Sequence, residues 1–359
     1  MASGTTGTSK TMRRTILFPV KVCIPMMIIL TGCPYGYKYD QGWLPTTPVN
    51  MEYFNTEWDD YNLDAPVYGK TLPLLFSSNR KSKGGNYDII FEIFDIWFDR
   101  DDGTITSGKA DDYRYDLTRE LLILGMVPPT INTSYNELGP YLIDYYSLYS
   151  DWDSKYQQKY LVLYANDHTG NLDIMYTMND HHGYDSALEF VDPEPVIFLN
   201  SGYNEAYPSI DKDLNRIYYC SDQNGDFDIF ICQLATDDQM PDVFQDTLID
   251  PSISRSDILS SDEDDKCPYF SVNIIVFTSN RMGGYGGFDL WYAKKEGNEW
   301  SAPVNFGEKI NTSYNEYRPI LIPLYEFKND LLMFSSDRPG GKGGYDLYWA
   351  GVEPLTGLR

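Results

Sequence analysis

The chain contains the same unit five times, and this internal repeat limits its fold more than any other feature. Each copy has an apolar run rich in aromatic and β-branched residues, a polar break, and an Asp-[Ile/Leu] step into a second apolar run. This order is typical of a β-hairpin. The copies begin at Leu74, Val162, Ile217, Ile275 and Leu332. Repetition of one hairpin predicts an architecture of equivalent small sheets.

A second motif precedes every hairpin in register. It is INTSYNELGP at 131–140 and INTSYNEYRP at 310–319, with weaker copies at 54–63, 199–208 and 259–268. Successive copies start 77, 68, 60 and 51 residues apart. A unit of about 50 residues with three or four short strands has the length of a propeller blade, which buries its faces against its neighbours.

The position of the outer strand predicts how the ring closes. Trp300 and the segment 303–305 (Pro-Val-Asn) follow the fourth hairpin, and nothing similar follows the fifth. A matching segment occurs near the N-terminus, where Trp43 precedes 48–50. The N-terminal strand should therefore complete the last blade and leave no unpaired sheet edge. The predicted fold is all-β, a five-bladed β-propeller over residues 43–359. Its blades are expected at about 54–128, 131–196, 199–256, 259–307 and 310–350 plus 43–50.

The repeats also carry a family resemblance. FTSNRMGGYGGFDL at 277–290 and FSSDRPGGKGGYDL at 334–347 resemble the WD40-like PD40 repeats of TolB-type β-propellers. Such repeats are common in envelope lipoproteins of Bacteroidota, so the resemblance implies a cell-envelope protein. Copies 2 and 3 lack the double glycines, and Leu63 stands in copy 1 where the other copies have Pro.

Residues 1–32 have the layout of an export signal, with basic residues before an apolar stretch. The stretch is about 15 residues long, and a membrane span needs roughly 20. The ending Leu-Thr-Gly-Cys33 resembles the bacterial lipobox, which implies a lipid on Cys33 and a tether over 33–42. An ordinary signal peptide that contains a cysteine is the alternative. We expect a lipid-anchored outer-membrane protein, with the periplasmic or cell-surface side left open.

The charge of the chain limits its partners. The formal net charge is -25, and removal of 1–32 takes away four Lys/Arg and no acid, which leaves -29. A field of this sign repels nucleic acid and anionic lipid headgroups. We therefore expect no nucleic-acid partner and membrane attachment through the lipid alone.

Three cysteines, Cys220, Cys232 and Cys267, fall within the predicted propeller, with no metal-binding spacing. Cys220 and Cys232 lie on neighbouring predicted strands and would be able to pair, but buried free thiols are the favoured state. The glycines at 283–287 lie between two strands of a hairpin, where turns need positive φ angles and little room is left for a Cβ. A nucleotide-binding loop would need a following helix or Gly-Lys-[Ser/Thr], and neither is present.

Two sets of carboxylates recur with the blades. One set precedes the inner strand: Asp60, Glu137, Glu205, Asp265 and Glu316. The other lies in the hairpin: Asp88, Asp173, Asp228, Asp289 and Asp346. Recurrence in every blade argues against catalysis, because an acid and a base need unlike environments. Turn capping is the simpler role.

Arginines of three hairpins would be able to pair with these carboxylates: Arg80, Arg281 and Arg338. His168 and Gln223 replace Arg in blades 2 and 3, so this set of arginine–carboxylate pairs should be incomplete there. A cation held by a ring of carboxylates at the channel mouth is an alternative. The sequence otherwise predicts no metal and no cofactor.

Function is sought where the repeat symmetry breaks, in segments 91–116 and 144–159. Both are expected to be loops on the face opposite the hairpin turns. Their aromatic residues suit sugar stacking or a protein hot spot: Trp97, Tyr145, Tyr146, Tyr149, Trp152 and Tyr156. The alternative is that they pack on the blades as covers.

The sequence lacks G-x-S-x-G and H-E-x-x-H, and this absence indicates a protein that is not an enzyme. The leading hypothesis is a non-catalytic lipoprotein whose propeller docks another envelope protein. A surface glycan-binding protein is the alternative. A five-bladed glycoside hydrolase is a third possibility, and it needs carboxylates of unlike setting roughly 5 to 9.5 Å apart.

Overall fold

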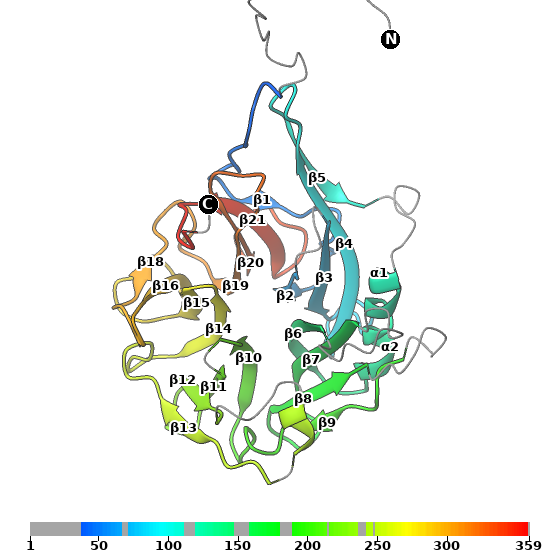
Figure 1. Cartoon of the computed structure of the whole chain (residues 1–359), viewed down its shortest axis with the longest axis vertical. Helices are drawn as coiled ribbons and strands as arrows, with labels where there is room; N and C mark the ends of the chain where they lie inside the picture. Colours follow the sequence, from blue (N-terminus) through cyan, green and yellow to red (C-terminus); the bar gives the residue numbers. More distant parts are fainter. Residues whose placement is uncertain are drawn as a thin grey trace, which may run out of the picture. The chain divides into compact units, whose positions relative to one another are not determined.

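The propeller is seen in a computed structural model, in which five antiparallel sheets surround a central axis (Figure 1). The structure describes residues 37–66, 71–110, 119–146, 158–179, 189–213, 215–235, 242–246 and 248–357. Five small sheets in a ring confirm the predicted five-bladed β-propeller. No helix among the described residues is long and apolar enough to cross a membrane.

Each blade is one sheet, and its strands follow one another outward from the axis. Blade 1 is β2 (Asp60–Asp64), β3 (Thr71–Ser78), β4 (Asp88–Phe98) and β5 (Ile105–Lys109). Blade 2 is β6 (Glu137–Tyr146), β7 (Gln158–Asn166), β8 (Asp173–Met178) and β9 (Glu194–Pro195). Blade 3 is β10 (Glu205–Asp211), β11 (Arg216–Ser221), β12 (Asp228–Gln233) and β13 (Ser252–Arg255).

Blade 4 is β14 (Asp265–Ser271), β15 (Ile274–Ser279) and β16 (Asp289–Glu296), with β17 (Glu299–Trp300) and β18 (Val304–Asn305) on its outer edge. Blade 5 is β19 (Glu316–Ile322), β20 (Asp330–Ser336) and β21 (Asp346–Val352), completed by β1 (Val49–Asn50). The connections carry α1 (Arg119–Leu124), α2 (Val127–Ile131) and the short 3-10 helix η1 (Asp242–Gln245).

The hydrophobic core is divided into layers between neighbouring blades. Leu75 and Ile89 of blade 1 pack with Leu142 and Val162 of blade 2, for example. Because each sheet is covered on both faces, its second strand is an unbroken apolar run, and β15 and β20 are buried at every position. This is the physical reason that the repeats show apolar runs instead of alternation.

Every innermost strand has a β-bulge at the same place, two residues after its first carboxylate. The bulged residues have positive φ: Asn62, Gly139, Tyr207, Cys267 and Arg318. They meet at the axis, where the Arg318 guanidinium lies 5.5 Å from the Tyr207 ring centre and the Asn62 amide donates to the Tyr207 hydroxyl at 3.4 Å. A Cβ on Gly139 would overlap the Tyr207 ring, so glycine is required there.

The N-terminal strand closes the ring as predicted. Val49 pairs with Trp349 and Asn50 with Tyr348 in an antiparallel register. The buried Leu44 adds a second contact, since its N–H donates to the Asn329 side chain at 2.8 Å. The first and the last strands of the chain are thus paired in one sheet (Figure 1).

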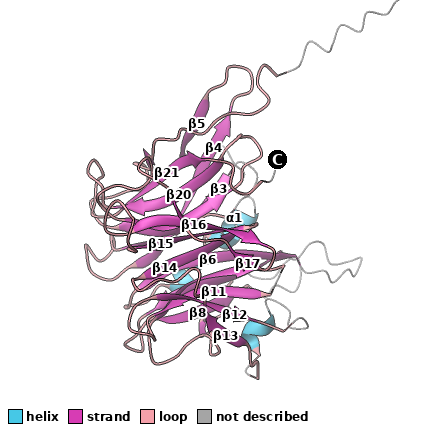
Figure 2. Ribbon diagram, turned by 90° about the vertical axis from the view of Figure 1, so that its left-hand side faces the viewer, coloured by secondary structure: helices cyan, strands magenta, loops and turns pink. Residues whose placement is uncertain are grey.

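Residues 91–110 differ from the expectation that segment 91–116 is a loop, and residues 111–116 lie outside the described part. Residues 91–98 continue β4, and 105–109 form β5, which pairs with β4 from Phe94 to Phe98. The β4–β5 hairpin extends past the other sheets in both views (Figures 1 and 2). The expectation was wrong because this stretch has the alternating β-branched and aromatic composition of a strand.

The three cysteines of the propeller are buried and free. Cys220 lies opposite Ile229 and Cys232 lies opposite Ile217, so the two thiols are three positions out of register. They also belong to different layers of the core. Cys220 and Cys232 therefore do not pair.

Candidate functional site

Residues of the repeated motif form hydrogen bonds that connect neighbouring blades. The Asn311 side chain accepts the Leu290 N–H at 2.8 Å and donates to the Leu290 carbonyl at 2.9 Å. Asn55 makes the same two bonds to Leu347 across the closure. Motif residues occupied in this way hold the ring together and are not available for a ligand.

Three blades have a buried carboxylate paired with the arginine of its own hairpin. The guanidinium also donates to a backbone carbonyl of the turn before the strand, from Arg80 to Phe54 and from Arg338 to Ile310. The contact places the start of the inner strand and the hairpin turn on one face, called the hairpin face below. The pairs are Arg80–Asp60 at 2.6 Å, Arg338–Glu316 at 2.9 Å, and Arg281–Asp265.

Blades 2 and 3 lack this arginine, and their carboxylates differ from the others. Glu137 is buried; its Oε1 accepts from Thr133 at 2.6 Å and Asn166 at 2.9 Å, and its Oε2 has no hydrogen-bond partner. Burial raises the pKa of Glu137 to about 7, although hydrogen bonding to Thr133 opposes the rise. Burial also raises the pKa of Glu205. The five carboxylates are therefore not equivalent.

The hairpin carboxylates of blades 4 and 5 accept hydrogen bonds within their own turns. The Asp289 carboxylate accepts the Tyr285 N–H at 2.5 Å and the Gly286 N–H at 3.2 Å, and Asp346 repeats the arrangement. Gly284 and Gly286 have no room for a Cβ, which would overlap the Asp289 carboxylate and a carbonyl of the next blade. These glycines therefore serve the turn and the close approach of two blades.

The aromatic residues expected to form a binding surface are only partly described. Trp97 lies on β4 and is 39% exposed. The backbones of Tyr145 and Tyr146 end β6. Their side chains lie outside the described part, as do Tyr149, Trp152 and Tyr156. Cys33 also lies outside it.

A different group of aromatic side chains gathers around the axis on the hairpin face. We call it the axial aromatic cluster: Tyr61, Tyr87, Phe288, Tyr317 and Tyr345. The Tyr61 ring centre is 4.9 Å from that of Tyr87 and 5.6 Å from that of Tyr345, and Phe288 lies 5.4 Å from Tyr317. All five are half-buried.

Sequence reasoning missed this cluster, although the signal was present. Each member directly precedes or follows one of the repeated carboxylates, as Tyr61 follows Asp60 and Tyr345 precedes Asp346. The five-fold arrangement brings those neighbouring positions together around the axis. The repeated carboxylates therefore lie near the cluster in the fold. The aromatic side chains next to them in the sequence, and not the carboxylates, form the cluster at the axis.

Two further acids lie on this face where the symmetry breaks. Asp59 and Asp264 occupy the position that is Asn in the other three motif copies. Asp59 accepts from the Tyr87 hydroxyl at 2.7 Å and the Tyr345 N–H at 2.9 Å. Burial acts to raise the pKa of Asp264, but the Phe227 N–H and the Lys266 ammonium, 2.9 Å away, leave it lowered overall. The two acids thus have unlike settings.

Side chains fill the axis below the cluster. Arg318 is fully buried; its Nη2 donates to the Pro140 carbonyl at 3.1 Å, while Nε and Nη1 have no hydrogen-bond partner. Asp64 accepts the Leu142 N–H at 2.6 Å. Burial raises the pKa of Asp64 to about 6, and Leu142 and Arg318 oppose the rise.

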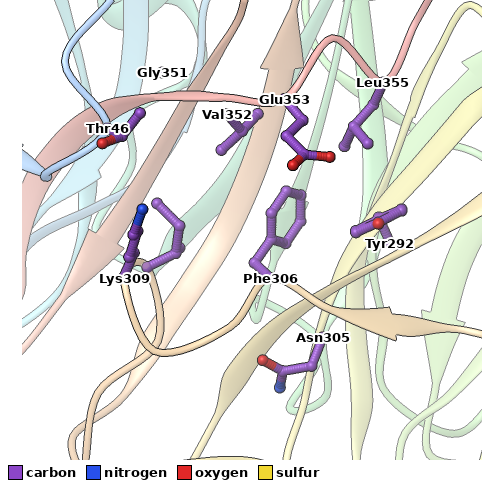
Figure 3. A pocket seen from close by; sticks show the side chains of 10 residues that line it. Thr46, Tyr292, Asn305, Phe306, Lys309, Gly351, Val352, Glu353 and Leu355 are labelled. Atoms are coloured by element: carbon purple, nitrogen blue, oxygen red, sulfur yellow. The ribbon is translucent and has the colours of Figure 1, made fainter.

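A pocket of about 310 Å³ opens where the ring closes, between blades 4 and 5 (Figure 3). We call it the rim pocket. Tyr292 on β16 and Phe306 after β18 form an aromatic wall, with ring centres 4.9 Å apart. Lys309 and Glu353 are exposed and have no hydrogen-bond partner among the described residues. The other lining residues are Thr46, Asn305, Ile310, Gly351, Val352 and Leu355.

The rim pocket depends on the closure of the ring. Thr46 comes from the segment before β1, while Val352 and Leu355 come from the end of the chain. A site made from such distant segments has no local motif. Within the described ranges, no group of three or more His, Cys, Asp or Glu residues is arranged to hold a metal ion.

No family model matches the chain, and no curated protein matches its sequence. Several of the similar solved structures are named as glycoside hydrolases. An α-L-arabinofuranosidase from Podospora anserina, solved with cellotriose, is 10% identical with a TM-score of 0.47, over 89% of this chain and all of that one. A GH62 α-L-arabinofuranosidase catalytic domain from Coprinopsis cinerea is 10% identical with a TM-score of 0.45, over 88% and 97%.

A glycosyl hydrolase from Bacteroides ovatus is 11% identical with a TM-score of 0.41, over 89% of this chain and all of that one. These comparisons contradict two expectations from the sequence, namely a non-catalytic docking module and a protein that is not an enzyme. The missing motifs belong to other hydrolase classes, so their absence did not exclude glycosidase chemistry. At these identities the likeness concerns the fold.

Proposed function

We propose that this propeller is a carbohydrate-active protein that binds a glycan in the rim pocket. The observation that carries the proposal is the combination of two adjacent aromatic rings with unpaired polar side chains in one cavity. A volume of about 310 Å³ lies at the lower end of the range for small-molecule sites, roughly 300 to 1,000 Å³. It suits one or two sugar rings of a longer chain.

The chemistry of the lining fits a sugar. The apolar face of a pyranose packs on aromatic rings such as Tyr292 and Phe306, which have large contact areas. Lys309, Glu353 and Thr46 supply a cation, an anion and a hydroxyl group for the sugar hydroxyls. Because these groups have no protein partner to give up, binding would leave few polar groups unpaired.

Calorimetry against a panel of neutral and acidic oligosaccharides tests the proposal. We expect Phe306→Ala to weaken binding at least tenfold, since it removes half of the stacking wall. Tyr325→Ala is the matched control, because Tyr325 is 83% exposed and lies outside the pocket. Equal affinities for both variants, or no binding by the wild type across the panel, would rule out this site.

Hydrolysis of the bound glycan is the second candidate, with the axial aromatic cluster as its location. It is favoured by two acids of unlike setting. Asp59 accepts from Tyr87 of the cluster. Asp264 is paired with Lys266, whose ammonium lies 5.1 Å from the Phe288 ring centre. Glycosidases use a pair of carboxyl groups in which one acts as acid and the other as base or nucleophile. Different surroundings give the two carboxyl groups different pKa values, and this difference assigns one as acid and the other as base or nucleophile.

Release of reducing sugar from polysaccharides measures this activity. Asp59→Asn should abolish hydrolysis without loss of stability, because three motif copies already have Asn there and keep their inter-blade bonds. Asp262→Asn is the matched control for the loss of one charge, because Asp262 is exposed and lies two residues before Asp264. Unchanged hydrolysis in both Asp59→Asn and Asp264→Asn would refute the catalytic role.

We also propose that the chain is exported and lipid-anchored through Cys33, as a PD40-type propeller of the outer membrane. The signal-like residues 1–32 and the Leu-Thr-Gly-Cys33 sequence support this. Labelling with a fatty acid should modify the wild type and not Cys33→Ala. Protease treatment of intact cells would then distinguish the cell-surface side from the periplasmic side.

A further inference from the structure

We propose that a metal cation, with calcium as the best fit, binds beside Glu137 in the place that an arginine guanidinium occupies in blades 1, 4 and 5. The five blades can be compared with one another, because the same structural position occurs in every blade. Three copies show what the position is built to hold, and the copy in blade 2 lacks that group.

In blade 5 the position is filled by Arg338. Its Nη2 donates to the Glu316 carboxylate at 2.9 Å and to the Ile310 carbonyl at 2.7 Å. Its guanidinium carbon lies 5.2 Å from the Phe334 ring centre. A carboxylate, a carbonyl and an aromatic face thus surround one positive charge.

We call this set of a carboxylate, a backbone carbonyl and an aromatic ring the cradle. Blade 1 has the same cradle with different side chains. Arg80 contacts the Asp60 carboxylate and the Phe54 carbonyl, and its guanidinium carbon lies 5.3 Å from the Phe76 ring centre. The cradle therefore recurs when the carboxylate is Asp instead of Glu. The common element is a positive charge among oxygens.

In blade 2 the residues that surround the arginine in blade 5 have equivalents in the sequence, and the arginine is absent. Glu137 takes the place of Glu316, while Ile131 and Tyr164 take the places of Ile310 and Phe334. The residue at the arginine position is His168, which is exposed and packs edge-on against Tyr135 at 4.6 Å. The Oε2 atom of Glu137 is left buried and without a hydrogen-bond partner.

An unpaired carboxylate oxygen in this position is costly, because burial removes water without supplying a partner. The charge of Asp88 on the same face adds repulsion, and it contributes to the raised pKa of Glu137. A cation relieves both costs. Carboxylate and carbonyl oxygens are the ligands that calcium prefers, with water completing its shell.

Blade 3 also lacks the arginine, yet neither oxygen of its carboxylate is left without a hydrogen-bond partner. The Glu205 Oε2 accepts the Ser201 N–H at 2.9 Å, and its Oε1 accepts from the Ser221 hydroxyl at 2.8 Å. Both oxygens of Glu205 are therefore satisfied. The proposed site belongs to blade 2 alone.

Thermal unfolding at pH 8 tests the proposal, with calcium added at constant ionic strength set by choline chloride. With one protein carboxylate, we expect binding in the millimolar range, about 10⁻⁴ to 10⁻³ M. Saturation should raise the Tm of the wild type by roughly 2 °C. Glu137→Gln and His168→Arg should not respond, since the first removes the carboxylate and the second supplies the guanidinium. Glu205→Gln, the matched control, should respond like the wild type.

Terbium luminescence gives a second measurement on the wild-type protein. Tyr164 lies close enough to Glu137 for the glutamate charge to raise the pKa of its hydroxyl. Its ring should therefore sensitise a terbium ion bound there, and calcium should displace that ion. Loss of this calcium-sensitive emission in Glu137→Gln would support the site. An equal calcium response of the wild type and Glu137→Gln in either measurement would overturn it.

Discussion

Replacing Glu137 by Gln should stabilise the protein at alkaline pH and leave it unchanged in acid. The folded state raises the pKa of Glu137 from an ordinary 4.5 to about 7, chiefly through burial. The folded protein therefore holds this proton more tightly than the unfolded chain. Stability is lost as pH rises from about 4.5, and the full loss is reached above pH 7.

The size of the effect follows from the shift. The rise in the pKa of Glu137 from 4.5 to about 7 corresponds to about 3 kcal/mol of folding free energy, since one pKa unit is about 1.4 kcal/mol. Screening by water on the hairpin face reduces the expected value to about 1 to 2 kcal/mol. The amide of Gln keeps an oxygen for Thr133 and Asn166, so the two existing bonds survive the substitution.

The assay is chemical denaturation in calcium-free buffer at pH 5 and pH 8. Glu316→Gln is the control of opposite sign, because it leaves the half-buried Arg338 without its carboxylate. We expect that variant to lose about 3 kcal/mol at both pH values. If Glu137→Gln destabilises the protein at pH 8 as Glu316→Gln does, an unseen cation or hydrogen bond satisfies Glu137, and the argument from burial fails.

Three further predictions concern stability. Gln223→Arg should add about 1 kcal/mol, because it supplies the missing guanidinium beside Glu205, and equilibrium denaturation measures the gain. Leu44→Ala should cost about 3 kcal/mol by leaving a cavity at the closure, and a loss below 1 kcal/mol would show that the N-terminal segment does not hold the ring. Gly286→Ala should lower the Tm by several degrees, since its Cβ overlaps the next blade, whereas Gly202→Ala meets open space and should be neutral.

Function was harder to predict from the sequence than the fold. The expectation of a non-catalytic module rested on the near-equivalence of the repeated carboxylates. The structure divides them, since Asp60 is paired with an arginine while Glu137 is not. The substitution of His168 for Arg was visible in the sequence, but its effect on the pKa of Glu137 depends on burial by the neighbouring blade.

The amino-acid sequence by itself determined the number of blades, their order and the closure by β1. Repeated hairpins carry that information locally, because the apolar runs and turn residues recur in register. Only the tertiary structure decided which side chains meet. The rim pocket joins Thr46 to Leu355, and the axial aromatic cluster joins Tyr61 to Tyr345. Such contacts arise because ring closure brings segments about 300 residues apart into one place, and no local pattern records that distance.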